Sequence, residues 1–313
     1  MSPATVAQSV LDAAGPQAAA IERLWWLIFF ITAAVFAALM IVLAIAVVRR
    51  SHRQSSDVIM TRWVIAASAA TVAILFVWLL ASISTSKVTA SPQMADAVTI
   101  NITGRQWWWQ LEYSDSQPSN RFRAANEMLI PVGRPVVVNV TSRDVIHSFW
   151  VPNLHGKRDL IPGYITSLWF QADREGIYRG QCAEFCGYQH ANMAMFVRAV
   201  PDTDFQAWLA NQRKPAIDPA SEVERRGRDV LLRATCPQCH AIRGTIAGGA
   251  FGPDLTHVGS RATIAAGILQ NTTENLRRWI RNPQQFKPGI KMPAHDLNDG
   301  DLQAVAEYLR SLR

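Results

Sequence analysis

The sequence predicts a multidomain membrane protein with a two-helix transmembrane hairpin, a β-sandwich and an all-α C-terminal domain. Two long runs, residues 24–48 and 63–86, contain no charged residue. A stretch that alternates between apolar and polar residues follows them, and the last part of the chain has the spacing of amphipathic helices. The 313 residues are enough for two or three domains.

Each uncharged run is long enough to cross a bilayer, which takes about 20 apolar residues in a helix. A pair of buried core helices is the alternative, but uncharged runs of this length are uncommon in soluble folds. The segment between the runs contains four arginines against one acid, Asp57. Because positively charged loops stay in the cytoplasm, we expect the tail of residues 1–23 and everything after Lys87 to face outward. We therefore treat residues 24–86 as a transmembrane hairpin.

Composition argues against a nucleic-acid partner. A net charge of +7 is typical of many nucleic-acid-binding proteins. However, this sequence has two apolar spans and no basic run outside the inner loop. The first 22 residues contain neither Lys nor Arg, which also argues against a secretory signal peptide at this position.

A period of two begins after the second span and predicts an antiparallel β-sandwich over about residues 97–200, within a domain of residues 87–200. Proline and glycine residues separate the candidate strands. The expected strands are residues 98–102, 107–113, 136–140, 165–170 and 193–200.

The remainder of the chain is predicted to be a linker, residues 201–221, and a helical domain, residues 222–313. The linker includes a short helix over residues 204–213, which a proline-rich segment ends. The expected helices of the last domain are residues 223–234, 264–269 and 274–281 and one that begins at Asp299.

The most informative stretch is residues 182–193, Cys-Ala-Glu-Phe-Cys-Gly-Tyr-Gln-His-Ala-Asn-Met. It gathers two thiols, an imidazole and a thioether within 12 residues, and His147 lies upstream. Soft sulfur ligands and imidazole favour copper. A mononuclear blue-copper site uses one Cys, two His and a weak axial Met. The second Cys therefore indicates two metal ions bridged by two thiolates, an arrangement suited to the rapid transfer of single electrons.

Two alternatives remain at this stretch. A structural zinc site of the Cys₂His₂ type is compatible with the Cys spacing, but it leaves Met193 without a role, and zinc does not carry electrons. Because side chains alternate along a strand, Met193 and Met195 are expected on the same face. Spacing alone therefore does not choose between the two methionines.

The run Cys236-Pro-Gln-Cys239-His240 is the attachment motif of c-type haem. The two thiols form thioethers with the haem, and the adjacent His is the proximal iron ligand. Downstream of it the sequence has one methionine, Met292, as a candidate for the sixth ligand. Ligation by His and Met raises the haem potential, as in electron-transfer cytochromes.

The other histidines have simpler explanations. His257 and His295 are the competing sixth ligands, and each is interpreted as an ordinary surface histidine. His52, in the inner loop, and His155, in a sandwich loop, are expected to be solvated. For the Cys-x-x-Cys pair itself, a redox dithiol or a zinc pair is the alternative, and it leaves the flanking sequence unexplained.

The pattern Cys-x-Glu-x-Cys-x-x-x-His-x-x-Met, with the earlier Asp-Val-x-His-Ser, resembles the binuclear copper A domain of cytochrome c oxidase subunit II. This resemblance covers about residues 20–200 and implies a cupredoxin fold. It also implies that the carboxylate of Glu184 binds a magnesium or manganese ion at the interface with subunit I. Residues 157–163 resemble another segment of the family that lies near this interface. The copper ligands that it implies are His147, Cys182, Cys186, His190, Met193 and the backbone carbonyl of Glu184.

Residues 104–109, Gly-Arg-Gln-Trp-Trp-Trp, are a second match to the family. The first aromatic residue of this triplet is the surface point at which electrons reach the copper in the family, which implies that role for Trp107. Three core aromatics on one strand are the alternative, since a period of two places Trp107 and Trp109 opposite Trp108. In one respect the sequence departs from the family: many members have a Glu at the start of the second helix that serves a proton channel, and here Asp57 is only a weak substitute.

Residues 222–313 resemble a class I cytochrome c, through the haem motif, the Gly-Pro-Asp-Leu loop at residues 252–255 and the closing helix. The whole chain is thus similar to subunit II of a caa-type haem–copper oxidase. This resemblance implies a multi-pass protein of the bacterial inner membrane, with both redox domains on the periplasmic side. It implies the transfer of electrons from a cytochrome c or a bc complex, through haem c and two copper ions, to subunit I, with subunit III as a further partner.

Three other functions compete with this one. A copper A-containing nitric oxide reductase subunit would have the same ligands. A quinol oxidase subunit keeps the fold but lacks the copper ligands, so the intact set argues against it. A membrane-anchored copper-binding module would leave the haem motif and the Trp triplet without a purpose.

Overall fold

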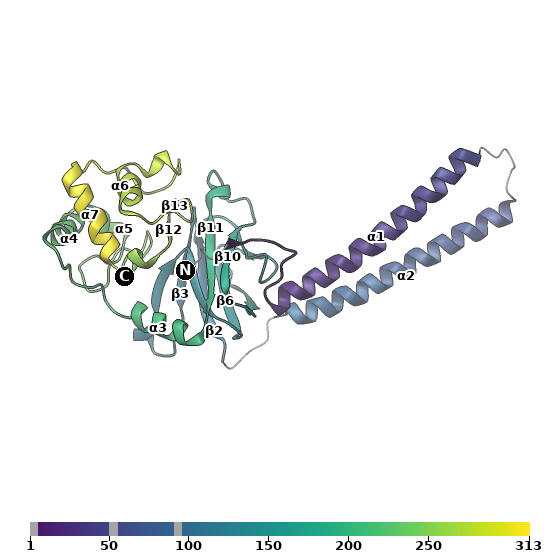
Figure 1. Cartoon of the computed structure of the whole chain (residues 1–313), viewed down its shortest axis with the longest axis horizontal. Coiled ribbons are helices and arrows are strands. Elements are labelled where there is room, and N and C mark those ends of the chain that lie inside the picture. Colours follow the sequence, from purple (N-terminus) through teal and green to yellow (C-terminus); the bar gives the residue numbers. More distant parts are fainter. Residues whose placement is uncertain (1–5, 50–55, 91–95) are drawn as a thin grey trace.

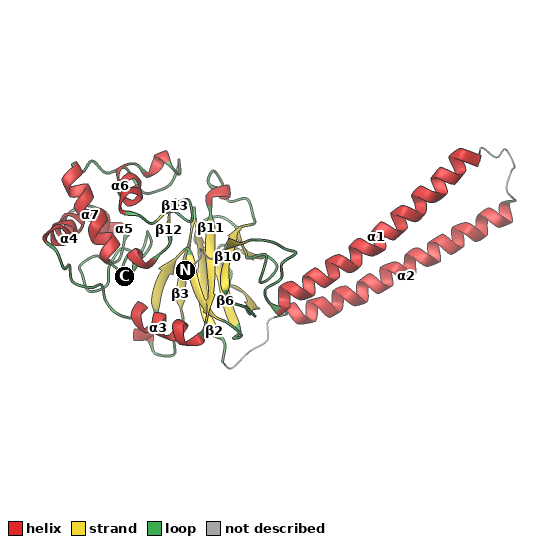
Figure 2. Cartoon of the chain, viewed as in Figure 1, coloured by secondary structure: helices red, strands yellow, loops and turns green. Residues whose placement is uncertain are grey.

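The computed structural model describes residues 6–49, 56–90 and 96–313. A hairpin of two long helices projects from one side of a β-sandwich, and a helical domain lies on the side away from the hairpin (Figure 1). Most strands gather in the central part, between the hairpin and the helical domain (Figure 2). The three predicted parts are therefore present in the predicted order.

The hairpin consists of α1 (Pro16–Arg49) and α2 (Asp57–Thr89), which are 34 and 33 residues long. Both helices extend beyond the predicted spans, and their apolar side chains are exposed on all sides over most of their length. A helix that is apolar all round suits lipid rather than water. These helices therefore anchor the chain in a membrane. His52, which was expected to be solvated in the loop between them, lies outside the described residues.

The segment before the hairpin packs on the sandwich. Strand β1 (Val6–Ala7) pairs in parallel with β10 (Gly176–Cys182). The amide of Ala14 donates a hydrogen bond of 2.7 Å to the carbonyl of Asn153. The chain therefore leaves and returns on one side of the hairpin, as two spans require, and the outward orientation of that side stays a prediction. The end of the predicted tail already belongs to α1.

The sandwich consists of two sheets with the strand orders β5-β11-β10-β7-β8 and β4-β3-β2-β6-β9. Strands β2 and β6 run in parallel, as do β5 and β11, so the expectation of purely antiparallel pairing was wrong. Each parallel pair joins strands that are separated along the chain, and long connections permit this pairing where tight hairpins do not. The strand bounds are β2 Val98–Arg105, β3 Trp108–Tyr113, β4 Phe122–Ala125, β5 Glu127–Pro131, β6 Val136–Ser142, β7 His147–Trp150, β8 Arg158–Leu160, β9 Thr166–Phe170, β10 Gly176–Cys182 and β11 Ala194–Val200.

The core of the sandwich follows from alternation along its strands. In β2, Ile100 and Ile102 are fully buried, and in the adjacent β6, Val138 and Val140 are too. The residues between them are half-buried on the other face. Burial of each such side chain contributes about 1.5–3 kcal/mol relative to exposure, which is why the register of these strands is fixed.

The C-terminal domain is helical apart from one short hairpin. Its first helix begins with a capping box in which Ser221 and Glu224 satisfy each other's backbone amides. This helix, α4, packs across α7, and Gly227 lies at the crossing point. The helix bounds are α3 Asp202–Gln212, α4 Glu222–Arg233, α5 Cys236–Cys239, α6 Thr273–Arg281 and α7 Asp299–Ser311, with 3₁₀ turns at Pro118–Asn120, His190–Asn192, Val258–Ser260 and Pro283–Gln285.

The helix predicted over residues 264–269 is not present. The structure has a hairpin of β12 (Thr263–Ile264) and β13 (Leu269–Gln270) instead. Ala265 and Ala266, between the strands, have φ values of 57° and 58°. This left-handed backbone does not continue a right-handed helix, so the apolar composition was misleading here.

The crossing of α4 and α7 gives a first prediction. A Cβ added at Gly227 would lie 2.0 Å from the carbonyl oxygen of Ala304, so Gly227→Ala forces the helices apart. We expect a loss of about 1–3 kcal/mol in the unfolding free energy of this domain, despite the better helix propensity of alanine. Denaturant unfolding of the full chain, followed by haem absorbance, measures it.

Gly248→Ala is the matched control, because a Cβ there meets no atom within 4 Å. Equal stability of the two variants would show that the helix crossing tolerates a side chain.

Candidate metal centre and haem cavity

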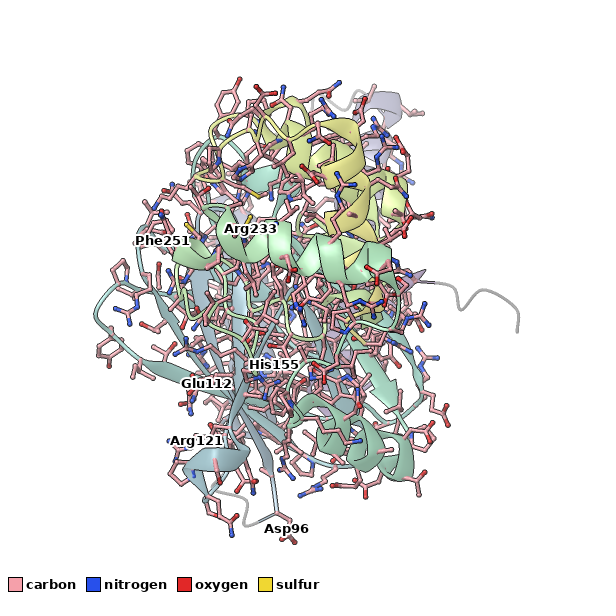
Figure 3. All side chains as sticks on the ribbon, turned by 90° about the vertical axis from the view of Figure 1, so that its left-hand side faces the viewer. Asp96, Glu112, Arg121, His155, Arg233 and Phe251 are labelled. Carbon is pink, nitrogen blue, oxygen red and sulfur yellow. The ribbon has the colours of Figure 1, made fainter. Side chains whose placement is uncertain are left out.

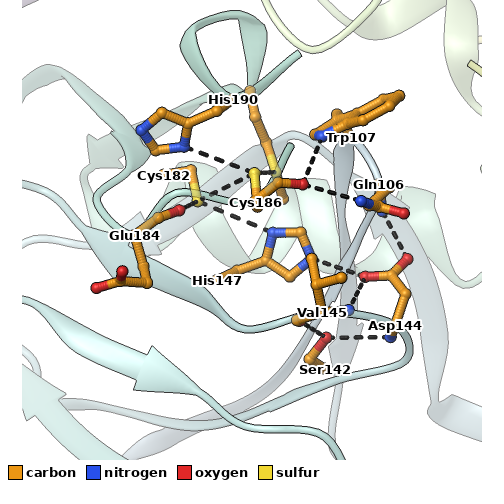
Figure 4. Close-up of polar contacts among 11 residues, drawn as sticks. Gln106, Trp107, Ser142, Asp144, Val145, His147, Cys182, Glu184, Cys186 and His190 are labelled. Atoms are coloured by element: carbon orange, nitrogen blue, oxygen red, sulfur yellow. Dashed lines mark hydrogen bonds and ion pairs between the residues drawn. The ribbon is translucent and has the colours of Figure 1, made fainter. Parts of the chain in front are cut away.

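Two thiol sulfurs lie at the centre of the first site (Figure 4). The Sγ atoms of Cys182 and Cys186 are 3.7 Å apart. The Nδ1 atom of His147 is 3.8 Å from the Cys182 sulfur, and that of His190 is 3.6 Å from the Cys186 sulfur. Cys182 ends β10 and His147 begins the neighbouring β7, so sheet pairing brings together residues that are far apart in sequence.

A weaker donor accompanies each sulfur. The Met193 Sδ atom is 3.9 Å from the Cys186 sulfur, and the carbonyl oxygen of Glu184 is 3.2 Å from the Cys182 sulfur. Met193 precedes β11, so it does not share a strand face with Met195 in the way that was predicted. The structure therefore places all six predicted donor groups together, with Met193 rather than Met195 beside the sulfurs.

Asp144 orients one of the imidazoles. Its carboxylate is 2.8 Å from the Nε2 atom of His147 and accepts a 2.7 Å hydrogen bond from the amide of Gln106. Burial disfavours charge on both groups and is the largest single effect, but several contacts together outweigh it. The bond to His147 and the amides of Gln106 and Val145 lower the pKa of Asp144, and the bonds to Asp144 and Cys182 raise the pKa of His147. With Nε2 held in this way, Nδ1 faces the sulfurs, as a metal ligand requires. Asp144 begins the Asp-Val-x-His-Ser motif, but the sequence alone indicates no role for it.

The chemistry of the two thiols fits a cationic occupant. The hydrogen bond that the sulfurs share lowers the pKa of Cys182 and raises that of Cys186. Two thiolates so close repel each other, so the pair keeps one proton until a cation compensates the charge. His147, Cys182 and Cys186 are buried, and their ligand atoms lie within 4.8 Å of one another. Soft donors in this arrangement fit a pair of copper ions.

Trp107 lies beside the metal centre but not on the surface. Its Nε1 atom donates a 2.9 Å hydrogen bond to the carbonyl of Cys186, and the side chain of Gln106 donates another to the same oxygen. Only 9% of Trp107 is exposed, because the C-terminal domain covers it. Trp109 is fully buried and Trp108 half-buried, as a period of two predicts. The surface position that the family implies for Trp107 is therefore wrong for this chain.

The carboxylate of Glu184 points away from the sulfurs. It is 3.5 Å from the ammonium of Lys157, which is also 3.6 Å from Asp159. The structure thus pairs Glu184 with a cationic side chain, and its role in binding magnesium or manganese stays a prediction.

The second site is a cavity of about 420 Å³ between the two external domains. Cys236, Cys239 and His240 line it, together with Met292, and Trp107 forms part of the opposite wall. Figure 3 views the molecule with the helical domain toward the reader and Phe251 at the surface of that domain. The described residues thus provide a largely apolar cavity with the thiols, an imidazole and a thioether that covalent haem needs.

One hydrogen bond orients the proximal histidine. The Nδ1 atom of His240 is 2.7 Å from the carbonyl oxygen of Pro253, and burial lowers the pKa of the imidazole. A neutral ring that donates Nδ1–H in this way presents the lone pair of Nε2 to a metal.

The competing histidines lie in different surroundings. His257 is buried rather than on the surface, and its ring nitrogens lie 3.0 and 3.1 Å from the carbonyl oxygens of Arg313 and Lys214. It therefore joins the C-terminus to the linker and does not face the cavity. His295 lines the cavity along with Met292 and remains an alternative ligand. His155 is also buried, beside the carbonyl of Gly156, and not solvated as expected.

The fold and the two sites define a membrane-anchored protein that joins a cupredoxin-like domain with a dithiolate metal centre to a c-type cytochrome domain. Residues 98–200 match the family described as cytochrome c oxidase subunit II, periplasmic domain, and residues 224–313 match the cytochrome c family. The chain therefore contains an external domain of the cytochrome c oxidase subunit II family and a cytochrome c domain. These families imply copper A and haem c, respectively.

Two curated proteins and one solved structure are similar to parts of this chain. Cytochrome c oxidase subunit 2 of Alkalihalophilus pseudofirmus is 41% identical over 224 residues, which are 71% of this chain and 64% of that protein. The corresponding protein of Bacillus sp. strain PS3 is 33% identical over 233 residues, which are 70% of this chain and 63% of that protein. The match thus spans somewhat less than two thirds of these relatives. The crystal structure of the periplasmic domain of subunit II of cytochrome oxidase of Bradyrhizobium japonicum is 34% identical over 40% of this chain and 97% of that one, with a TM-score of 0.37.

The contact between Asp144 and His147 gives a second prediction. Asp144→Asn removes the charge that orients the imidazole, and we expect copper affinity to fall about tenfold to a hundredfold. Copper titration of the purified protein, followed by near-infrared absorption, measures this. Asp204→Asn, an exposed carboxylate at the start of α3, is the control. Equal affinity in both variants would show that His147 keeps its orientation without Asp144.

The haem cavity gives a third prediction. We expect Met292→Ala to lose the low-spin haem spectrum and His295→Ala to keep it, because a thioether completes His–Met ligation. The copper absorption should remain in both variants. Optical and magnetic circular dichroism spectra of the oxidised protein measure the outcome, and the reverse result would assign His295 as the ligand.

Proposed function

We propose that this chain is the subunit through which electrons enter a respiratory cytochrome c oxidase. It receives them from a cytochrome c or a bc complex and passes them through haem c and the binuclear copper A centre to subunit I, which reduces oxygen to water. The observation that carries this proposal is the position of Trp107, which lines the haem cavity and bonds to the carbonyl of the metal-binding Cys186.

The residues of the chain hold two redox groups on a rigid framework. When bound, copper and haem each supply one-electron oxidation and reduction. The copper ligands proposed are His147, Cys182, Glu184, Cys186, His190 and Met193, and the haem ligands and attachment residues proposed are Cys236, Cys239, His240 and Met292. Buried strands and a packed interface fix these side chains, which keeps the structural change between redox states small.

Exposed side chains near the metal centre support the proposal that a partner subunit binds there. Phe185 and Tyr188, in the loop that carries the cysteines, are both more than three-quarters exposed, and Tyr164 and Ile165 are exposed as well. Exposed apolar patches of this kind mark interaction surfaces. We infer that subunit I covers this patch, with Glu184 at the interface as a ligand for magnesium or manganese, and that subunit III completes the complex.

The hairpin of α1 and α2 supports the proposal that the protein lies in a membrane. We propose a multi-pass protein of the bacterial inner membrane whose copper and haem domains lie on the periplasmic side. The test of function is oxygen uptake by the purified complex with reduced cytochrome c as donor. Nitric oxide reduction without oxygen uptake would favour a copper A-containing nitric oxide reductase instead.

Electron passage past Trp107 gives a fourth prediction. We expect Trp107→Leu to slow electron transfer from haem to copper and oxygen uptake, because it removes the bonded indole between the two sites. Haem and copper spectra should remain. Trp108→Leu removes a neighbouring indole that also lines the haem cavity but is not the one that bonds to the Cys186 carbonyl, and it should have a much smaller effect. Flash-induced reduction of the haem, followed at copper and haem wavelengths, measures both, and equal rates would exclude the indole from the route.

A further inference from the structure

A buried lysine lies at the interface between the cytochrome domain and the sandwich. Lys287 follows the 3₁₀ turn Pro283–Gln285 of the cytochrome domain and is 2% exposed. Its Nζ atom donates hydrogen bonds of 2.8 Å to the carbonyls of Trp107 and Asn192 in the sandwich. A longer bond of 3.3 Å reaches the carbonyl of Ala265 in its own domain.

The three acceptors match the chemistry of an ammonium group. Burial lowers the pKa of Lys287 to about 7. The protonated amine has three N–H bonds, one for each carbonyl, whereas the neutral amine has only two. A charge-assisted bond of this kind is stronger than a neutral one, and its loss leaves buried carbonyls without partners.

The two carbonyls in the sandwich belong to segments that flank the metal centre. Asn192 directly precedes Met193, and Trp107 bonds through its indole to the carbonyl of Cys186. One side chain of the cytochrome domain therefore holds both segments that run from the metal centre toward the haem cavity.

A second anchor reaches across the interface in the opposite direction. The carboxylate of Glu127, in β5 of the sandwich, accepts hydrogen bonds of 3.0 and 2.8 Å from the amides of Ala262 and Thr263. The Ala194 amide in turn donates to the carbonyl of Ala266, at 3.2 Å. The interface is thus held by directional bonds from both sides, which specify one relative position of the domains.

We propose that Lys287 is a positioning residue that holds the cytochrome domain on Trp107, so that haem passes electrons to copper from one docked position and not from a mobile, tethered domain. This inference rests on the proposed function. The step that it positions moves one electron from the reduced haem iron, which is oxidised, to the oxidised copper pair, which is reduced, and no covalent bond forms or breaks.

The test uses Lys287→Met in the full oxidase complex, because methionine fills similar space without charge. Flash-induced electron transfer from haem to copper should slow about tenfold to a hundredfold, as small misplacements of reacting groups typically do. Hydrogen exchange of the Thr263 and Ala194 amides should become faster, because both bonds cross the interface. Reduction of the haem by an external donor and the near-infrared copper band should stay unchanged.

Two further variants complete the experiment. Lys214→Met, an exposed lysine of the linker, should leave both the transfer rate and amide exchange as in the unmodified protein. Glu127→Gln weakens the second anchor. It should change the electron-transfer rate and the amide exchange in the same direction as Lys287→Met, to a smaller extent. It provides the test if Lys287→Met fails to fold.

The outcomes separate the two proposals. If the unmodified protein passes no electrons from haem to copper, the proposed function fails. If it does, and the Lys287 and Glu127 variants keep its transfer rate and its exchange pattern, the positioning role of Lys287 is wrong.

Discussion

The sulfurs of Cys182 and Cys186 lie 3.7 Å apart in a buried position, and the arrangement around them depends on how this pair is stabilised. Two thiolates at this distance repel each other strongly, so the pair keeps one proton unless bound cations compensate the charge. The imidazoles of His147 and His190 approach one sulfur each. The sandwich therefore presents a prearranged set of soft donors, which limits the movement that a change of metal charge can cause.

The strands and loops around the two sulfurs position the proposed copper ligands. His147 is fixed by the register between β7 and β10 and by its bond to Asp144, whereas Cys186 and His190 lie in a loop that ends in a 3₁₀ turn. The cytochrome domain packs against the other side of this region and buries Trp107. In the proposed function, the fused cytochrome domain replaces a diffusing donor that would otherwise have to find the sandwich. The sandwich and linker together, residues 86–221, contain 13 basic and 12 acidic residues and have little net charge to steer such a donor.

Much of the fold could be predicted from the sequence, for reasons that are local. Uncharged runs indicated the hairpin, alternation indicated the strands, and amphipathic spacing indicated the helices of the last domain. The helix expected over residues 264–269 failed because the left-handed turn at Ala265 and Ala266 depends on packing against the sandwich, which no local pattern reveals. Parallel pairing of β2 with β6 is likewise a property of the whole sheet.

In the candidate sites, too, some residues could be predicted from the sequence, and others needed the tertiary structure. Short motifs predicted most of the proposed copper and haem residues, since these residues are close in sequence or follow a recognised spacing. The role of Asp144 needed the geometry of His147, and the surroundings of His257 and His155 needed the tertiary fold. Lys287 has no sequence signal, because its acceptors are backbone carbonyls of residues far away along the chain.

We infer that the thiolates of Cys182 and Cys186 share two copper ions. Metal analysis of the purified protein, combined with electron paramagnetic resonance of its oxidised form, tests this inference. We expect two copper ions in the sandwich and one unpaired electron shared equally between two copper nuclei. A single copper with a localised signal, or zinc in their place, would contradict it.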